Sequence, residues 1–451
     1  MSASASTGPG AWLRRADPGY PSRRAGLSVS AWQPPRPMPA AIATPHTPDE
    51  VVEAVRRARA EGLRLAVRGG GHSLSATHLV DGAAVLDLRH LTRFDVKRES
   101  ATAWVGPGVT TLAAAAALDA VELSFPVGHA PTVGLSGFLL AGGNGWNTPV
   151  WGHGCERVLA ADVVFADGRR AVVDDETDPD LFRVLRGAGP AYPGVVVAFR
   201  LQLAPEPPRI RRHVVEVDAR DAERVGATLD EVVATLPAHV DTTVFWHPAR
   251  ADDDVPTLTV AATSFAPGID DGLDPIRSAD LPVLSTASTD AGRSLFQLLD
   301  PLPRHEGDAM FSDHLWTDAG YRALLPLLPT RDPRLNAASS VLLTTSARRA
   351  DGAAPGRAVY SPSGRMSVSA YAHWDPASQG PEHPVGWARQ VIARLAHLGN
   401  GCYVGEADLT AGRATLTDCF GGAGADLVRR VVARLDPDRV MATPFTGHHG
   451  S

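Results

Sequence analysis

Apolar side chains recur at helical spacing in the first clearly patterned part of the chain, residues 47–62. The segment opens with Thr47-Pro48-Asp49-Glu50, a capping box with proline at the first helical position. Gly62 ends the predicted helix. An apolar strand is predicted directly afterwards, over residues 63–67. The apolar face of the helix consists of Val51, Val52, Val55 and Ala58.

The following pattern divides the chain into two regions of different character. Up to residue 205, short strands are predicted over 84–88, 102–105 and 195–199, and helices over 112–118 and 181–186. After the proline-rich break at 205–208, strands dominate, with intervening helices and a last helix over 425–435. This alternation predicts an α+β fold with a mainly antiparallel sheet. The later strands are predicted over 210–217, 241–246, 257–263, 340–346 and 366–371, and the helices over 222–236 and 385–398.

Two glycine-rich segments interrupt the pattern and carry the strongest functional signal. The first, Gly69-Gly70-Gly71, follows a strand and precedes His72. Consecutive glycines expose backbone N–H groups and permit positive φ, so this turn can wrap a phosphate or a flat ring. A plain tight turn is the alternative. The second segment, 125–145, contains six glycines, which favours a close approach of backbone to a ligand over a simple strand or helix.

Composition narrows the class of protein. A chain of 451 residues predicts two or three domains, and a net charge of −7 argues against a nucleic-acid partner. No uninterrupted apolar window approaches about 18 residues, so no membrane span is expected. The cysteines, Cys155, Cys402 and Cys419, form no metal-ligand spacing. We therefore expect packing cysteines, no metal site and a cytoplasmic location.

Four ordered motifs closely resemble the berberine bridge enzyme-like FAD-linked oxidases, within the vanillyl-alcohol oxidase group. The resemblance is strong over residues 35–205, weak in the middle and moderate over 400–445. The motifs are Arg68-Gly69-Gly70-Gly71-His72-Ser73 with Asp81-Gly82 and Val85-Leu86-Asp87-Leu88, Gly128-His129-Ala130-Pro131-Thr132-Val133-Gly134 through Gly142-Gly143, Asp180 to Gly187 with the strand at 194–199, and Asp436-Pro437-Asp438-Arg439-Val440.

This resemblance implies a two-lobed PCMH-type FAD-binding domain and a central substrate domain whose antiparallel sheet is covered by helices. The expected divisions are a flexible N-terminal segment, 1–34, an FAD-binding domain, 35–205, a substrate-binding domain, 206–399, and a C-terminal return to the FAD-binding domain, 400–451.

The resemblance also implies covalently bound FAD. His72 matches the histidine that the family joins to the flavin C8-methyl carbon. Many members add a second bond from a cysteine, but that position is Ala130 here, so a single linkage is expected. The cofactor-binding residues implied are Arg68, Gly69, Gly70, Gly71, His72, Ser73, Gly128, His129, Thr132, Val133, Gly134, Gly137, Gly142, Gly143, Gly194 and Val195.

Three residues are the candidate catalytic groups. Tyr403 matches a family tyrosine that helps to deprotonate the substrate, a role that requires a lowered pKa; packing under the flavin is the alternative. Tyr371 and His373 lie on or just after a predicted strand and suit a pocket for a planar substrate, although strand-end aromatics are more often core. Trp151 and Ser369 replace a tyrosine and a Gln or Glu that are common in the family.

The predicted function is that of an FAD-dependent oxidase or dehydrogenase. It would remove a hydride from a small secondary metabolite or sugar-like alcohol and pass the electrons to O2, as a monomer or homodimer. The departures from the family pattern keep a second hypothesis open. In it the flavoprotein does no net redox turnover and catalyses a cyclisation or rearrangement in natural-product biosynthesis.

Overall fold

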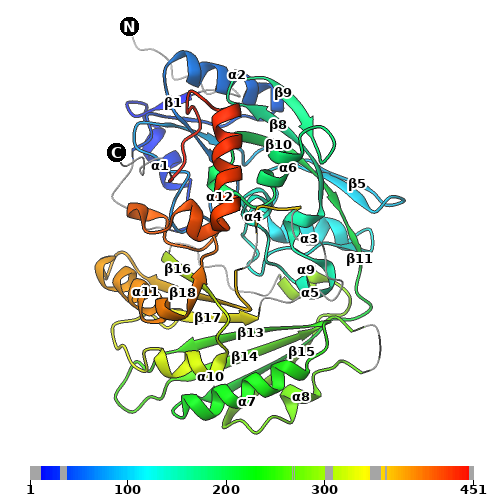
Figure 1. Ribbon diagram of the computed structural model, residues 1–451, viewed down its shortest axis with the longest axis vertical. Coiled ribbons are helices and arrows are strands. Elements are labelled where there is room, and N and C mark those ends of the chain that lie inside the picture. Colours follow the sequence, from blue (N-terminus) through cyan, green and yellow to red (C-terminus); the bar gives the residue numbers. More distant parts are fainter. Residues whose placement is uncertain are drawn as a thin grey trace.

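Two lobes stacked along the long axis make up the protein (Figure 1). The computed structural model describes residues 12–30, 38–266, 268, 270–299, 308–345, 357–360 and 363–445. The upper lobe contains the strands up to β11, and the lower lobe contains one large sheet.

A four-stranded sheet forms the N-terminal part of the upper lobe, in the order β1-β2-β4-β3. Strands β2, β4 and β3 are parallel, and β1 pairs antiparallel with β2. Helix α2 begins where the capping box predicts, since the Thr47 side chain accepts the Glu50 N–H. Its Val51 and Val55 are fully buried against this lobe. The elements are β1 (Trp12–Arg14), α1 (Tyr20–Ala25), β2 (Ala41–Ala43), α2 (Pro48–Ala60), β3 (Leu65–Arg68) and β4 (Ala84–Asp87).

The second part of the upper lobe is a five-stranded antiparallel sheet in the order β5-β6-β10-β8-β9. A short ribbon of β7 and β11 lies at the start of the connection to the lower lobe. The strands are β5 (Phe94–Lys97), β6 (Thr102–Val105), β7 (Leu123–Ser124), β8 (Val158–Phe165), β9 (Arg170–Val173), β10 (Gly194–Gln202) and β11 (Ala204–Pro205). The helices are α3 (Thr111–Asp119), α4 (Leu135–Ala141), α5 (Thr148–Trp151) and α6 (Pro179–Leu185).

The lower lobe is built on an eight-stranded antiparallel sheet in the order β15-β12-β14-β13-β17-β18-β16-β19. Helices α7, α10 and α11 cover one face, where Val244 and Trp246 are buried. The strands are β12 (Arg211–Asp218), β13 (Val240–His247), β14 (Thr257–Ser264), β15 (Val283–Asp290), β16 (Ala309–Thr317), β17 (Ser340–Thr345), β18 (Met366–Trp374) and β19 (Gly399–Gly401). The helices are α7 (Ala222–Thr235), α8 (Asp274–Arg277), α9 (Leu295–Leu299), α10 (Tyr321–Leu324) and α11 (Glu382–Leu395).

The chain returns to the upper lobe after β19. Helix α12 (Leu416–Leu435) contacts α6, and its backbone leaves helical geometry at Gly421, where φ is 66°. Beyond it, Met441 forms a parallel bridge with Leu65 of β3. Figure 1 shows α12, in red, lying against the blue and green elements of the upper lobe.

The predicted α+β fold, with an antiparallel sheet covered by helices, is confirmed. Several details differ from expectation. Within the segment expected to be flexible, 1–34, the described residues 12–30 form β1 and α1, because Tyr20 is buried and β1 pairs with β2. Strands β15 and β16 were missed, because β15 is exposed along its length and β16 is buried without alternation. Other elements that were not predicted include β2, β5, β8 and β9 of the upper lobe and helix α4, which lies within the glycine-rich segment 125–145.

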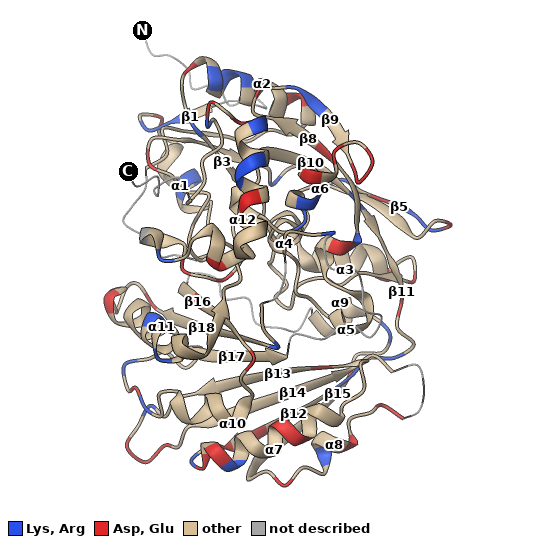
Figure 2. Cartoon of the chain, in the orientation of Figure 1, with Lys and Arg blue, Asp and Glu red and all other residues tan. Residues whose placement is uncertain are grey.

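Charges of both signs lie along the outer helices α2, α7 and α12 (Figure 2). Among the residues that the structure describes, no helix combines the length and the apolar character needed to cross a membrane.

Candidate active site

A cavity of about 590 Å³ is bounded by the two glycine-rich segments of the upper lobe and by the large sheet of the lower lobe. Its volume lies within the range of small-molecule and cofactor sites. The sheet residues on its wall include Thr243 and Phe245 of β13. They belong to the face opposite Val244 and Trp246, because alternate residues of a strand point to opposite faces.

The two glycine-rich segments touch each other backbone to backbone. A Cβ on Gly70 would lie 2.5 Å from the Gly134 Cα and N, and the reverse holds equally. Gly71 has a φ of +74°, which disfavours other residues. Glycine at these positions therefore lets both segments line one cavity.

Arg68 holds the first turn in shape from within. Its guanidinium donates to the carbonyls of Gly69 (2.8 Å), Gly70 (2.9 Å) and Leu27 (3.0 Å), and it pairs with the buried Asp87 at 3.2 Å. Although Arg68 reaches the wall, these contacts engage its donors. Arg68 therefore fixes the shape of the turn that lines the cavity.

Two histidines from this turn and the loop after it lie on the cavity wall, His72 and His78. Burial lowers the pKa of His72, so its imidazole is neutral near pH 7. Burial, with a smaller effect from Arg68, lowers the pKa of His78 to about 3. Neutral imidazoles retain a basic ring nitrogen.

The second glycine-rich segment contributes His129, Ala130 and Trp146 to the wall. Burial and the nearby Arg212 lower the pKa of His129 to about 4, and its ring lies 4.4 Å from that of Trp146, centroid to centroid. The next residue, Asn147, has left-handed backbone and donates its N–H to Asp241 of β13. Burial raises the pKa of Asp241 to about 7.

The predicted catalytic residues Tyr371, His373 and Tyr403 all lie on the wall. Tyr403 is held by its N–H, which donates to His314 Nδ1 at 2.9 Å. Burial and the neighbouring Glu406 raise the pKa of the Tyr403 phenol, whereas a base would need it lowered. No cationic side chain among the described residues lies close enough to Tyr403 to lower its pKa.

Most of the predicted cofactor-binding residues lie on the wall. They are Arg68, Gly69, Gly70, Gly71, His72, Ser73, Gly128, His129, Val133, Gly134, Gly137 and Gly194. Four others, Thr132, Gly142, Gly143 and Val195, are absent from the wall. Gly142 packs on the Tyr360 ring, and Val195 belongs to the core of the upper lobe.

Sequence reasoning missed His78, Arg212 and Glu406. Arg212, on β12, lies 5.9 Å from the centroid of the Trp146 ring. Glu406 accepts hydrogen bonds from the hydroxyls of Ser369 and Tyr371. The sequence could have indicated Glu406, because this acidic residue lies three positions after Tyr403 in an otherwise apolar and glycine-containing stretch.

The wall fits a ligand rich in polar atoms, as FAD is. His78 Nε2, Trp146 Nε1 and Tyr192 Oη are buried on it and have no hydrogen-bond partner among the described residues. Buried polar atoms ordinarily find a partner. These three atoms, with the backbone of the glycine turn and Ser73, are available to hydrogen-bond such a cofactor.

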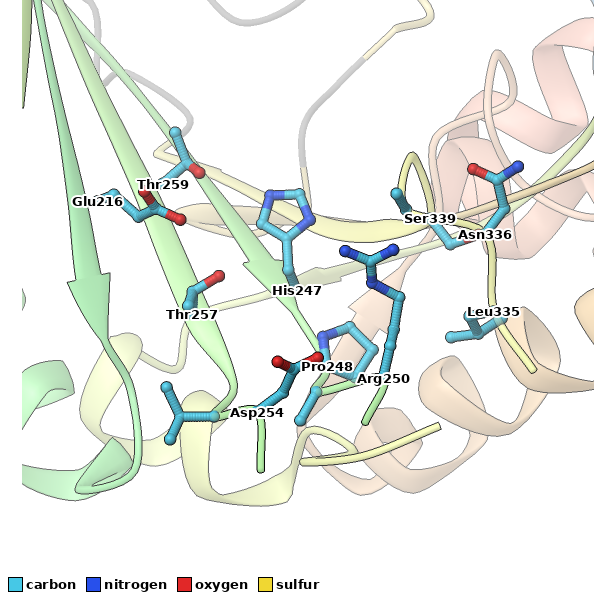
Figure 3. Close-up of a pocket in the computed structure, with 13 residues that line it drawn as sticks. Glu216, His247, Pro248, Arg250, Asp254, Thr257, Thr259, Leu335, Asn336 and Ser339 are labelled. Carbon is cyan, nitrogen blue, oxygen red and sulfur yellow. The ribbon is translucent and has the colours of Figure 1, made fainter. Parts of the chain in front are cut away.

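A second cavity, of about 380 Å³, lies further along the same face of β13 (Figure 3). The ring of His247 belongs to it and stacks on Phe245 of the first cavity, with 6.4 Å between ring centroids. Figure 3 shows His247 between the threonines of β14 and Arg250, with Glu216 on the β14 side. Its lining is mainly polar.

Comparison with known proteins gives a match to part of the upper lobe. Residues 39–174 match the family model of the FAD binding domain. An FAD-linked oxidoreductase of Penicillium janthinellum is 34% identical over 211 residues, which cover 47% of each chain. The matched part spans about half, or less, of the length of such curated relatives.

Solved structures match the whole fold. The crystal structure of 6-hydroxy-D-nicotine oxidase from Arthrobacter nicotinovorans superimposes with a TM-score of 0.82 at 22% identity, covering 96% of both chains. The berberine bridge enzyme-like protein 1 of Physcomitrella patens gives a TM-score of 0.82 at 17% identity, again covering 96% of both chains. The predicted resemblance is thus confirmed, and the chain carries an FAD binding domain on the fold of the berberine bridge enzyme-like flavoproteins.

Proposed function

We propose that this protein is an FAD-linked oxidase that removes a hydride from a small molecule and passes the electrons to O2. The observation that carries the proposal is the single cavity in which the glycine turn and His72 meet Tyr371, Tyr403 and Glu406. The oxidoreductase name of the P. janthinellum relative supports it. FAD supplies the hydride acceptor, and the protein orients the substrate against it.

His72 is proposed as the single point of covalent attachment. A neutral imidazole can attack an electrophilic carbon, and burial keeps His72 neutral. Ala130 lies on the wall at the position where some relatives carry a second linking residue, and it offers no nucleophile. We therefore propose one covalent bond to the flavin, from His72.

The proposed FAD-binding unit combines residues 35–205 and 400–451 around a substrate unit, 206–399. The bridge between Leu65 and Met441 and the contact of α12 with α6 support this division. Met441 and Ala442 also reach the cavity wall from the C-terminal part. The substrate would then lie between the flavin and the sheet.

The substrate would contact an aromatic and apolar surface on the sheet side. Phe245, Leu342 and Met310 contribute to it, with Tyr371 and His373 alongside. Such walls exclude water and favour a planar or hydrophobic substrate. We propose a secondary metabolite as substrate and the cytoplasm as location, the latter because no disulfide joins Cys155, Cys402 and Cys419.

Anaerobic mixing tests the redox function directly. The purified yellow protein is mixed without oxygen with small aromatic alcohols, cyclic amines and sugars, and the visible absorption of the flavin is followed. Bleaching by at least one class, reversed by air with formation of H2O2, is the expected result. A flavin that no compound bleaches would contradict the oxidase and favour the cyclisation or rearrangement.

A further inference from the structure

A buried carboxylate, Glu406, lies on the cavity wall beside the proposed substrate position. Its loop is fixed from both lobes. The Ser312 hydroxyl of β16 donates to the Glu406 carbonyl at 2.7 Å, and the Ser75 hydroxyl, three residues after His72, donates to the Ala407 carbonyl at 3.0 Å. Glu406 is therefore held between the sheet and the glycine turn.

Two hydroxyl groups bind the carboxylate itself. Ser369 and Tyr371, alternate residues of β18, both donate to it. No cationic side chain among the described residues lies close enough to Glu406 to lower its pKa. Burial raises the pKa of Glu406 above its ordinary value, and the two hydrogen bonds limit that rise. The carboxylate therefore has a raised affinity for a proton.

The phenols of Tyr403 and Tyr371, in contrast, hold their protons. Burial and the charge of Glu406 raise the pKa of both phenols far above neutrality. Each remains protonated and serves as a hydrogen-bond donor. Among these three groups, Glu406 is the carboxylic acid, and in its ionised form its two oxygens keep acceptor sites beyond those that Ser369 and Tyr371 occupy.

We propose that Glu406, hydrogen-bonded to Ser369 and Tyr371, is the group that accepts the substrate's proton. The inference rests on the proposed function. The substrate's C–H bond gives up a hydride with both electrons to the flavin, and its O–H or N–H proton passes to Glu406. That proton moves either directly or through the Tyr371 hydroxyl, which releases its own proton to the carboxylate. Reoxidation by O2 then removes both hydrogens as H2O2.

The Ser369 contact explains how a carboxylate can act at this place. Ser369 lies on β18, and its hydroxyl donates to Glu406. The acidic group thus reaches the sheet from the loop after Tyr403. Ser369 and Tyr371 are positioning residues, since they act through Glu406.

The test that needs no substrate uses 4-nitrophenol, whose ionised form is visible by its absorption. 4-Nitrophenol is titrated into the oxidised holoenzyme of wild type and of Glu406→Gln, at pH values above and below the pKa of 4-nitrophenol. The affinities of the two proteins are then compared. In the wild type the anionic carboxylate repels the phenolate, so only the neutral phenol binds well. Glu406→Gln should bind the phenolate about tenfold more tightly or better. Equal phenolate affinity in both proteins would overturn the proposal.

The kinetic test uses a substrate that bleaches the wild-type flavin. Glu406→Gln should slow anaerobic reduction by about 10²–10⁴-fold and remove the rise of the rate with pH that deprotonation of Glu406 produces. Ser369→Ala and Tyr371→Phe should shift that rise to higher pH, because each removes a hydrogen bond to the ionised carboxylate. Glu216→Gln, in the second cavity, is the matched control and should leave rate and pH profile unchanged.

The proposed oxidase function and the proposed role of Glu406 can be refuted independently of each other. If no compound reduces the wild-type flavin, the oxidase is refuted, and the 4-nitrophenol titration still decides whether Glu406 is ionised in the cavity. If Tyr403→Phe abolishes the pH-dependent rise while Glu406→Gln leaves it intact, Tyr403 is the proton acceptor and this inference is wrong. Flavin content and urea unfolding of each variant verify that it is folded.

Discussion

Burial sets the protonation of the ionisable side chains around the cavity. It lowers the pKa of His72, His78 and His129 and raises that of Tyr403 and Glu406. In each case burial shifts the equilibrium toward the neutral form, because removing a charge from water costs free energy. Neutral histidines suit attachment to and hydrogen bonding of a cofactor, and a carboxylate with raised pKa suits proton uptake.

Asp241 yields a prediction about stability and pH. Its folded-state pKa of about 7 lies above the unfolded value of about 3.9, so the native state binds the proton more tightly. Its contribution to stability is complete below the unfolded pKa and is lost as the pH rises through about 7. Asp241→Asn does not titrate and can still accept the Asn147 N–H.

Thermal unfolding of Asp241→Asn and wild type at several pH values measures this effect. The Tm of the variant relative to wild type should increase between about pH 5 and about pH 8. Asp253→Asn, on an exposed loop, controls for the loss of one negative charge. If the Tm of the variant relative to wild type stays constant over this range, or falls, the titration of Asp241 does not lower the stability of the protein in this way.

Among the structural elements, the contact between the two glycine-rich segments is the tightest constraint on the cavity. Gly70 and Gly134 meet through backbone atoms, which cannot rotate away as a side chain can. Gly134 has an ordinary φ of −77° and precedes α4, so a substitution there tests the contact rather than backbone strain. The position of α4 depends on this contact.

Gly134→Ala should destabilise the protein by about 1–3 kcal/mol and lower its flavin content, because the added methyl group forces the segments apart. Gly386→Ala is the matched control, since a Cβ there meets nothing within 4 Å in the middle of α11. It should raise the free energy of unfolding by about 0.5–1 kcal/mol through helix propensity. Urea unfolding and the flavin-to-protein absorbance ratio measure both. Normal stability and flavin content in Gly134→Ala would contradict the close contact.

At the scale of the whole molecule, the cavity collects residues from both lobes and from both ends of the chain. Its wall includes His72, Tyr371 and Met441. A cofactor bound there contacts segments that are otherwise far apart in the sequence. Its binding free energy is therefore added to the stability of the folded chain as a whole.

His72→Ala tests the attachment and this coupling together. Intact mass spectrometry of the denatured wild type should show one flavin adduct, and the variant should show none. The Tm of the variant should rise with added FAD, by an amount corresponding to about 2.7 kcal/mol at 100 times the Kd, while that of the flavinylated wild type should not change. His397→Ala, at an exposed position after α11, is the control. A remaining adduct in His72→Ala would place the linkage elsewhere.

Local patterns were sufficient for much of the fold. The capping box at Thr47 starts α2, and the Gly69–Gly71 turn follows β3 as predicted. The strand predicted over 241–246 corresponds to β13, which has one buried face. In contrast, β16 carries Asp313 and His314 within a buried strand, where Asp313 accepts the Asp408 N–H and His314 the Tyr403 N–H. Such polar residues suggest a loop until their partners are known.

The sequence by itself determined the two glycine-rich segments, the position of His72 and the family to which they point, because these depend on neighbouring residues and on ordered motifs. Only the tertiary structure decided which residues share the cavity and which proton state they hold. Glu406 lies 35 residues after Tyr371 in the sequence, and nothing local predicts the hydrogen bond between them. The pKa of each group depends on its distance from water and from other charges, and those distances exist only after the two lobes have come together.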